Sequence, residues 1–404
     1  MKIRLILAML FPMILLIAVS DQDEFGLEVT KYTPGGSVEW KNIYEDAKGE
    51  TVLVDRNDDI IISGLYKLDG EGNVVWRHDI AHYNLILDAE NNLYLDNFYF
   101  DLVKIGENGS VQWSHKYENL YVNILQVDQE NNVLLLASNE IDYETINSYL
   151  VKYNSQGEML WKKSFSYEQF HPGYIQQFVG TDIEKSIIVI GMNGDDEYNY
   201  LNTFISKLNQ SGNTIWANYY DYLYANAIVT KTGESILDLG TTIFCVDANG
   251  SELWSVAFSE STNHLLAPQD INIDNQGNIV SLYIEPWRDT YDNEVFVVKY
   301  SPDGEELWSA SLNRASDNMY NLRIDADDNI IIGGTSCTWH DCQCMTVKYT
   351  AQGAKKWTKF NRTGYGEESC GLDVDSEGHV IVGALLGVKY EKEEDDDEPG
   401  CGCF

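Results

Sequence analysis

Short hydrophobic runs rich in Val, Ile and Tyr recur along the chain, each bounded by Asn, Asp or Gly. Examples are TVLVDRNDDIIISG from Thr51, INIDNQGNIVSLYI from Ile271 and LRIDADDNIIIGG from Leu322. Two such runs on either side of a short polar turn are typical of a strand–turn–strand hairpin. No comparable stretch has its apolar residues at helical spacing. The pattern therefore predicts an all-β fold.

A second pattern also repeats. It consists of a β-rich dipeptide such as Lys-Tyr, a turn centred on Gly and then a Trp. KYTPGGSVEW and KYSPDGEELW are two of its copies. The copies end at Trp40, Trp76, Trp113, Trp161, Trp216, Trp254, Trp308 and Trp357. They are 36 to 55 residues apart, which is the range of β-propeller blades and of some helical arrays. The strand composition selects the propeller.

Each repeat supplies four strands, A to D, in which A–B and C–D are the two hairpins. We expect eight blades, or seven if one of the degenerate units near 179–190 and 227–239 is an insertion. The chain opens with a C–D pair at 27–41 and ends with A, B and C strands at 372–390. Joining the N-terminal strand to the last blade would close the ring and remove exposed sheet edges. The predicted propeller domain is 21–390.

The first twenty residues have the order of a secretory signal. Lys2 and Arg4 precede an apolar run from Leu5 to Val19, and small residues follow at Ala18-Val19-Ser20. The run is shorter than the ~20 residues of a spanning helix, although an uncleaved anchor is the alternative. No later stretch is long and apolar enough to span a membrane, so we expect a secreted or cell-surface protein.

The composition excludes some classes of partner. The 404 residues carry a net charge of −37 and a sequence pI near 4.3. Because phosphate backbones and anionic lipids require a basic surface, nucleic acid and lipid headgroups are excluded as electrostatic partners. The hydrophobic fraction of 44% is enough for a large core. We expect a monomer.

The Gly-x-x-x-Trp endings and the hairpins of the Asn-Ile-Ile-Ile-Gly-Gly type resemble the SBBP-type β-propeller repeats of bacteria and archaea. They are similar, more distantly, to the PQQ-like blades of quinoproteins and of outer-membrane assembly lipoproteins. The resemblance covers about 25–390 and implies a propeller scaffold. It says little about activity, because one fold hosts many functions.

The repeated residues have a structural interpretation. A Trp near the end of each outer strand would cover the seam between blades; ligand stacking is the alternative. An Asp begins most A–B turns, at Asp55, Asp88, Asp128, Asp274, Asp325 and Asp375. An Asp there normally accepts hydrogen bonds from its own turn. We therefore expect no metal or cofactor, with weak calcium sites as the alternative.

Loop length points to a candidate binding face. The A–B and C–D turns are short, whereas the long connections are B–C and D–A, which share the opposite face. Because binding residues concentrate in loops on a rigid scaffold, we expect a glycan or protein to bind there. Aromatic and acidic residues in these loops suit either ligand. The candidates are Tyr167, His171, Asp195, Asp196, Tyr222, Trp287, Arg288, Asp289, Tyr291, Trp339, His340 and Asp341. The alternative is that these rings only bury the loops.

The seven cysteines fall into three groups. Cys245 lies in a predicted strand and is expected to pack as an apolar group. Cys337, Cys342, Cys344 and Cys370 are disulfide candidates in an exported chain, with zinc as the less favoured alternative because the spacing is not a familiar zinc motif. Cys401 and Cys403 end an acidic tail at 391–404. They would form an anchor or a terminal disulfide loop.

Sequence motifs for catalysis are absent. There is no Gly-x-Ser-x-Gly elbow, no His-Glu-x-x-His and no phosphate-binding Gly loop. The alternative to a binding scaffold is an extracellular carbohydrate-active or quinone-type redox enzyme. Sequons at Asn108, Asn209, Asn249 and Asn361 are expected to be accessible.

Overall fold

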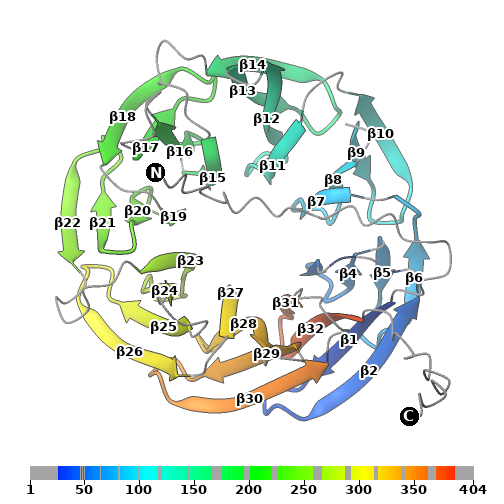
Figure 1. Ribbon diagram of the computed structural model, residues 1–404. Helices are drawn as coiled ribbons and strands as arrows, with labels where there is room; N and C mark the ends of the chain where they lie inside the picture. Colours follow the sequence, from blue (N-terminus) through cyan, green and yellow to red (C-terminus); the bar gives the residue numbers. More distant parts are fainter. Residues whose placement is uncertain are drawn as a thin grey trace, which may run out of the picture.

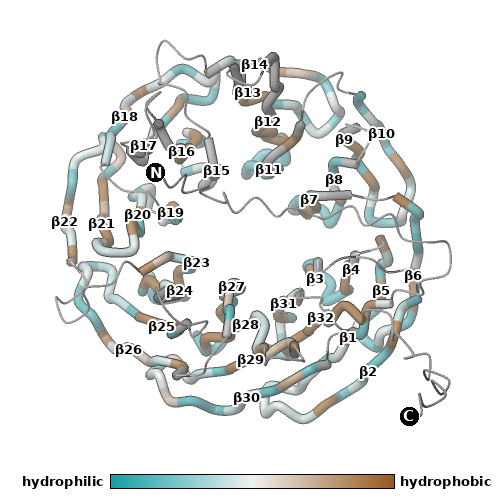
Figure 2. Tube along the Cα trace, viewed as in Figure 1, coloured by the Kyte–Doolittle hydropathy of each residue, from teal (hydrophilic) through white to brown (hydrophobic). Residues whose placement is uncertain are grey.

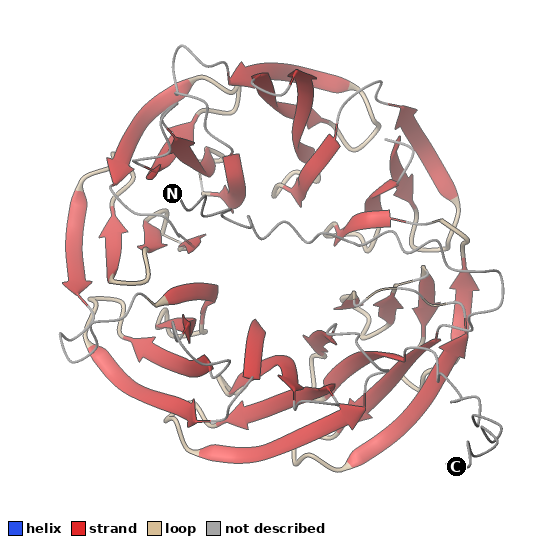
Figure 3. Cartoon of the chain, viewed as in Figure 1, coloured by secondary structure: helices blue, strands red, loops and turns tan. Residues whose placement is uncertain are grey.

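A computed structural model of the chain describes residues 26–386, except 46, 48, 50, 64, 81, 98–100, 117–120, 143–144, 166–174, 183, 195–200, 221–225, 231, 258–265, 287–292, 314–316, 338–341 and 363–369. The described residues form eight antiparallel sheets of four strands each. The sheets stand in a ring as blades (Figure 1), and every regular element drawn is a strand (Figure 3). The all-β propeller and the count of eight blades are confirmed, and the seven-blade alternative is wrong.

The first four blades each take their strands in chain order, from the centre of the ring outward. Blade 1 contains β3 (Val52–Val54), β4 (Ile60–Ile62), β5 (Tyr66–Leu68) and β6 (Val74–Arg77). Blade 2 contains β7 (His82–Leu87), β8 (Leu93–Asn97), β9 (Asp101–Ile105) and β10 (Val111–Lys116). Blade 3 contains β11 (Tyr121–Val127), β12 (Val133–Asp142), β13 (Thr145–Tyr153) and β14 (Met159–Phe165). Blade 4 contains β15 (Ile175–Thr181), β16 (Ile187–Gly194), β17 (Leu201–Leu208) and β18 (Thr214–Tyr220).

The other four blades complete the ring. Blade 5 contains β19 (Asn226–Val229), β20 (Ser235–Asp238), β21 (Thr242–Val246) and β22 (Glu252–Ala257). Blade 6 contains β23 (Ala267–Ile273), β24 (Ile279–Pro286), β25 (Asn293–Tyr300) and β26 (Glu306–Asn313). Blade 7 contains β27 (Asp317–Ile324), β28 (Ile330–Cys337), β29 (Cys342–Tyr349) and β30 (Lys355–Arg362). Blade 8 contains β31 (Cys370–Val374), β32 (Val380–Leu386), β1 (Gly26–Tyr32) and β2 (Val38–Glu45).

Blade 8 closes the ring with strands from both ends of the chain. β1 pairs with β32 from Gly26–Leu386 to Tyr32–Val380, and β2 pairs with β1 on its other side. The N-terminal closure is therefore confirmed, but the predicted C strand at 387–390 is wrong as an element of this sheet. β1 occupies the C position, and all seven of its residues are buried. The segment 387–390 lies outside the described residues.

The hydrophobic core lies in the seams between blades. Ile330 and Ile332 of β28 pack against blade 6, whereas Ile331 packs in a cluster with Leu372 and Val382 of blade 8. Alternate side chains of a central strand thus face the two neighbouring blades, so the strand is a continuous apolar run. Figure 2 shows that hydrophobic positions lie mainly on the strands inside the ring, and that the peripheral strands and turns are mostly paler or teal.

The antiparallel order gives the propeller two different faces. We call the face formed by the A–B and C–D turns the turn face, and the face formed by the B–C and D–A connections the loop face. The A–B turns close tightly, as between Asp55 and Asp59, and so do the C–D turns, as between Thr33 and Ser37. Apart from positions 183 and 231, the gaps in the described residues between 26 and 386 fall in loop-face connections.

Candidate functional site

Each repeat Trp joins its blade to the next one. The indole nitrogen of Trp308 donates to the carbonyl oxygen of Ala351 in the C–D turn of blade 7, at 3.0 Å. The ring also lies against Gly353, where an added Cβ would approach it to 2.7 Å. The same indole bond is made by Trp40, Trp76, Trp113, Trp161, Trp216, Trp254 and Trp357. These tryptophans are therefore structural, as predicted, and the ligand-stacking alternative is not supported.

The Asp at the start of the A–B turn forms a buried ion pair in seven blades. In blade 7, Lys348 Nζ lies 2.8 Å from Asp325 Oδ2, and both residues are buried. The corresponding pairs are Lys67–Asp55, Lys104–Asp88, Lys152–Asp128, Lys207–Asp182, Lys299–Asp274 and Lys31–Asp375. The Lys is the one that begins the repeated pattern before the Gly turn. An ammonium group thus fills the position that the calcium interpretation gave to a metal ion.

The turn carboxylates are also hydrogen-bonded to their own turns. Asp128 Oδ1 accepts from the backbone nitrogens of Glu130 and Asn132, and Oδ2 accepts from the Asn132 side chain. Burial by itself would raise the pKa of Asp128, but hydrogen bonds from Lys152 and Asn132 hold that pKa below its ordinary value. The same balance lowers the pKa of Asp274, Asp325 and Asp375.

Blade 5 replaces both members of the pair. Thr230 stands at the turn position, where its backbone closes the A–B turn to Glu234, and Cys245 stands at the Lys position. Cys245 is buried and has no disulfide, as predicted from the sequence, and burial raises the pKa of its thiol to about 12. The two substitutions occur together because either charge alone would be buried without its partner. The repeated Lys is visible in the sequence, but its pairing with the turn Asp was not predicted from it.

A cavity of about 610 Å³ lies at the turn-face ends of the inner strands. The inner strands of blades 1 to 5 line it with Val54, Leu87, Gln126, Thr181 and Val229 among others. At Gly180 an added Cβ would meet only Val229, at 4.0 Å, so no side chain fills that part. Arg56 and the Asp residues that begin the A–B turns of blades 1 to 3 also line it, so the lining is charged and polar as well as apolar. No sequence signal pointed to this cavity.

The inner strands of blades 6 to 8 are joined by charged side chains instead. Arg323 lies between two carboxylates, with Nε 3.2 Å from Asp373 Oδ1 and Nη1 3.7 Å from Asp270 Oδ2. Asp270 accepts from the Leu322 nitrogen and Asp373 from the Val54 nitrogen, which are backbone donors of the next blades. Burial raises the pKa of both carboxyls, and Arg323 offsets only part of that rise.

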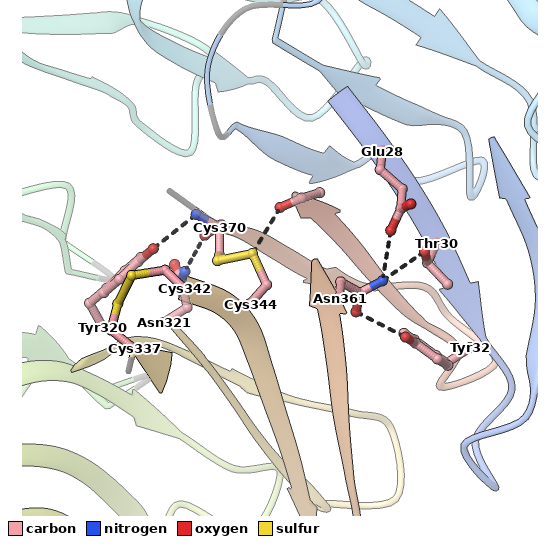
Figure 4. Close-up of a disulfide and its surroundings, with 11 residues drawn as sticks. Glu28, Thr30, Tyr32, Tyr320, Asn321, Cys337, Cys342, Cys344, Asn361 and Cys370 are labelled. Carbon is pink, nitrogen blue, oxygen red and sulfur yellow. Dashed lines mark hydrogen bonds between the residues drawn. A yellow bond between two sulfur atoms is a disulfide. The ribbon is translucent and has the colours of Figure 1, made fainter. Parts of the chain in front are cut away.

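Two disulfides lie at the loop-face end of blades 7 and 8 (Figure 4). Cys337 and Cys342 are cross-strand partners in β28 and β29, and their disulfide closes that hairpin. The other disulfide joins Cys344 of β29 to Cys370 of β31 in the next blade. Tyr320 Oη accepts from the Cys370 nitrogen and Asn321 donates to its carbonyl oxygen. The predicted disulfides among these four residues are confirmed, and the zinc alternative is wrong.

The sequon at Asn361 is not accessible, contrary to the sequence prediction. Asn361 is 2% exposed, and its amide group donates to Thr30 and Glu28 and accepts from Tyr32 Oη (Figure 4). The side chain belongs to the seam between blades 7 and 8. Asn108 and Asn249, by contrast, are exposed in C–D turns.

The predicted ligand residues lie outside the described residues. These are Tyr167, His171, Asp195, Asp196, Tyr222, Trp287, Arg288, Asp289, Tyr291, Trp339, His340 and Asp341, together with Cys401 and Cys403 of the tail. Their assignment to the loop face stays a prediction. Within the described ranges, no group of three or more His, Cys, Asp and Glu residues is arranged to hold a metal ion. The same ranges contain no helix long and apolar enough to cross a membrane.

Comparison with known proteins identifies the fold. No protein-family profile and no curated protein matches the chain. Among solved structures, the C-terminal WD40 domain of Sif2 matches with a TM-score of 0.52 and 8% identity, over 90% of this chain and 97% of that one. The propeller of Dos1 matches with a TM-score of 0.51 and 14% identity, over 90% of this chain and 93% of that one. At these identities the likeness shows the β-propeller fold alone.

Proposed function

We propose that this protein is an exported or cell-surface β-propeller of the SBBP type that binds a glycan or a protein on its loop face. One observation carries the proposal: the Cys337–Cys342 disulfide closes the end of the β28–β29 hairpin on that face. Only Thr338, Trp339, His340 and Asp341 lie between the two cysteines. A short loop that carries Trp and His between covalently joined ends has little conformational entropy left to lose on binding.

The structural roles of the turn-face residues also support placing the ligand site on the loop face. Its A–B carboxylates are paired with lysines or with their own turns, and its C–D turns hold the tryptophans of the preceding blades. Residues with structural partners on both sides cannot vary freely with a ligand. The loop-face connections are longer and vary more in length between blades, and binding residues concentrate in such loops.

Export is supported by two features together. The segment 1–20 has the order of a secretory signal, and the described residues contain two disulfides, which persist in oxidising compartments. The mature chain would then consist of the propeller domain at 21–390 and the acidic tail at 391–404, with Cys401 and Cys403 available as an anchor.

A thermal-shift panel on the secreted form tests the proposal, using diverse polysaccharides, calcium, a chelator and PQQ. A ligand at a hundred times its dissociation constant adds about 2.7 kcal/mol to the unfolding free energy. We expect a polysaccharide to raise the melting temperature without being degraded. Trp339→Ala is expected to weaken that binding at least about tenfold, whereas the matched variant Tyr219→Ala, which removes an exposed ring from outer strand β18, leaves it unchanged.

Other results assign the site or the function differently. Loss of binding in Thr181→Trp but not in Trp339→Ala would move the site to the turn-face cavity. Degradation of the polysaccharide, or a shift with PQQ, would replace the scaffold by an enzyme. If no compound shifts the melting temperature, affinity capture on wild type and Trp339→Ala tests the protein alternative. Capture that is equal on both would overturn the loop-face assignment.

A further inference from the structure

Outer strand β30 of blade 7 differs in charge from the rest of the molecule. Its sequence, KKWTKFNR, holds four cations and no carboxylate in eight residues, in a chain with a net charge of −37. The three lysines are Lys355, Lys356 and Lys359. The first two are exposed and the third is half-buried. This strand is therefore a local basic surface on a strongly acidic protein.

These lysines have no carboxylate partner within the described part of the chain. The repeat lysines, such as Lys348, are buried against an Asp, and the exposed Lys41 pairs with Glu28 at 2.7 Å. Lys355, Lys356 and Lys359 take part in none of the ion pairs of the described residues. Their charge is thus not used by the fold described above.

Protection of the sheet edge does not explain the cluster. Lysine on an edge strand does prevent unwanted strand pairing. However, the equivalent positions of other outer strands carry Val74 and Val75 in β6, and Met159 and Leu160 in β14, all of them exposed. Edge protection by Lys at this position is therefore not a general device of this propeller, and blade 7 has a separate reason for it.

The described structure ends in β32, a strand that contacts blade 7 on one side and β3 of blade 1 on the other. β32 packs against β29 and β30 of the neighbouring blade and ends at Leu386. The next four residues, 387–390, can extend about 14 Å. They are followed by EKEEDDDE at 391–398, which has seven carboxylates and one Lys. A strongly acidic segment is thus tethered beside the basic strand.

We propose that the acidic segment 391–398 docks on Lys355, Lys356 and Lys359 of its own propeller. Single exposed ion pairs are weak and are screened by salt. A short tether, however, gives the segment an effective concentration in the millimolar range, so several weak pairs suffice to hold it. We call the docked segment the strap; it is bound at low ionic strength and released at high ionic strength. The inference does not depend on what the loop face binds.

Docking on β30 would fix the direction in which the tail runs between the two faces of the propeller. β32 ends at the loop face, whereas Lys355 and Lys356 begin β30 next to the C–D turn on the turn face. A docked segment would therefore run from the loop face toward the turn face. Cys401 and Cys403 would end on the side opposite the loop face, so that an anchor formed there would leave the loop face directed outward.

Zero-length carbodiimide cross-linking of the full secreted chain tests the strap, because it joins carboxylates only to amines in direct contact. We expect peptides of 391–398 to be linked to Lys355, Lys356 and Lys359 at least about tenfold more often than to Lys162 and Lys163 of outer strand β14. In 1 M salt the preference is expected to disappear. Lys355→Gln/Lys356→Gln is expected to reduce the link to the retained Lys359 about fivefold, and the matched control Lys162→Gln/Lys163→Gln to leave it unchanged.

Several different results would contradict docking of the acidic segment on β30 of its own propeller. Equal linking to β14 and β30, or links that persist unchanged in 1 M salt, would overturn electrostatic docking on β30. Mixing chains of two isotopic compositions separates the two sources of the tail. Links mainly between chains would show that the tail of a second copy occupies β30, which overturns docking on its own propeller. Equal melting temperatures of the variants and wild type show that the lysine changes leave the fold intact.

Discussion

The indole nitrogen of Trp357 lies 3.2 Å from the carbonyl oxygen of Pro34, across a sequence separation of 323 residues. Trp357 belongs to the last complete repeat, and Pro34 lies in the turn between β1 and β2. The contact has the same form as those between blades that are neighbours in sequence, such as Trp308 with Ala351. The ring therefore closes with the contact that also joins its other blades.

Trp357→Phe is expected to weaken the closure by about 1 kcal/mol, because the Pro34 carbonyl loses its donor. Hydrogen exchange in β1 and β2 should become about fivefold faster. Trp216→Phe is the matched control, since it removes the same bond to Ala248 elsewhere in the ring. Faster exchange in β1 and β2 in both variants would contradict a local closing role for Trp357.

The Lys348–Asp325 pair is expected to behave as a unit. Lys348→Cys or Asp325→Thr alone leaves a buried charge without its partner and should cost about 3–5 kcal/mol. The double variant reproduces the Thr230 and Cys245 arrangement of blade 5 and should recover at least about 1 kcal/mol of the summed losses. Urea denaturation of the four proteins measures the coupling. Additive losses would show that the two charges do not stabilise each other.

Removal of one disulfide is expected to lower mainly the stability, and removal of the other mainly the affinity for the loop-face ligand. Cys344→Ala/Cys370→Ala opens a link across 26 residues between blades and should cost about 3 kcal/mol of unfolding free energy. Cys337→Ser/Cys342→Ser opens a link across only 5 residues. It should cost less stability and yet lower the affinity for the loop-face ligand. Calorimetry and titration of both variants give the comparison, and the reverse order of effects would refute it.

The free energy of unfolding is expected to fall as the pH rises from 4 to 6, because of Asp238. Burial raises the pKa of Asp238 to about 6, despite a hydrogen bond from the Gly240 nitrogen that favours the ionised form. The folded state therefore holds a proton that the unfolded chain releases near pH 4. This contribution is complete below pH 4 and is lost as the pH rises through 6.

Asp238→Asn should reduce the difference in unfolding free energy between pH 4.5 and pH 7 by roughly 2 kcal/mol. Asp96 contributes a slope of the same sign, because burial also raises its pKa to about 6. Asp128 and Asp325 act in the opposite direction only below pH 4, where their lowered pKa values are reached. Asp327→Asn, at an exposed turn position, is the control. An unchanged pH dependence in Asp238→Asn would contradict the assignment.

The repeat made most of the fold predictable. Trp40 to Trp357 gave the number of blades. The degenerate units near 179–190 and 227–239 proved to be blade hairpins, β15–β16 and β19–β20, although β15–β16 has two register shifts. The C strand of blade 8 was mistaken because 387–390 ends in Val-Lys-Tyr like a C strand. A local pattern cannot show that β1 occupies the same position, because that pairing joins residues far apart in the sequence. Tyr32 and Val380 are 348 residues apart, and Gly26 and Leu386 are 360 apart.

The sequence by itself predicted the strands, the hairpins, eight blades and disulfides among Cys337, Cys342, Cys344 and Cys370, because these follow from local periodicity and composition. Only the tertiary structure decided what lies across a seam: the partner of each buried Lys, the burial of Asn361 and the pairing of Cys344 with Cys370. These contacts depend on where each blade ends beside the next. That position is set by packing of the whole ring, which no single repeat encodes.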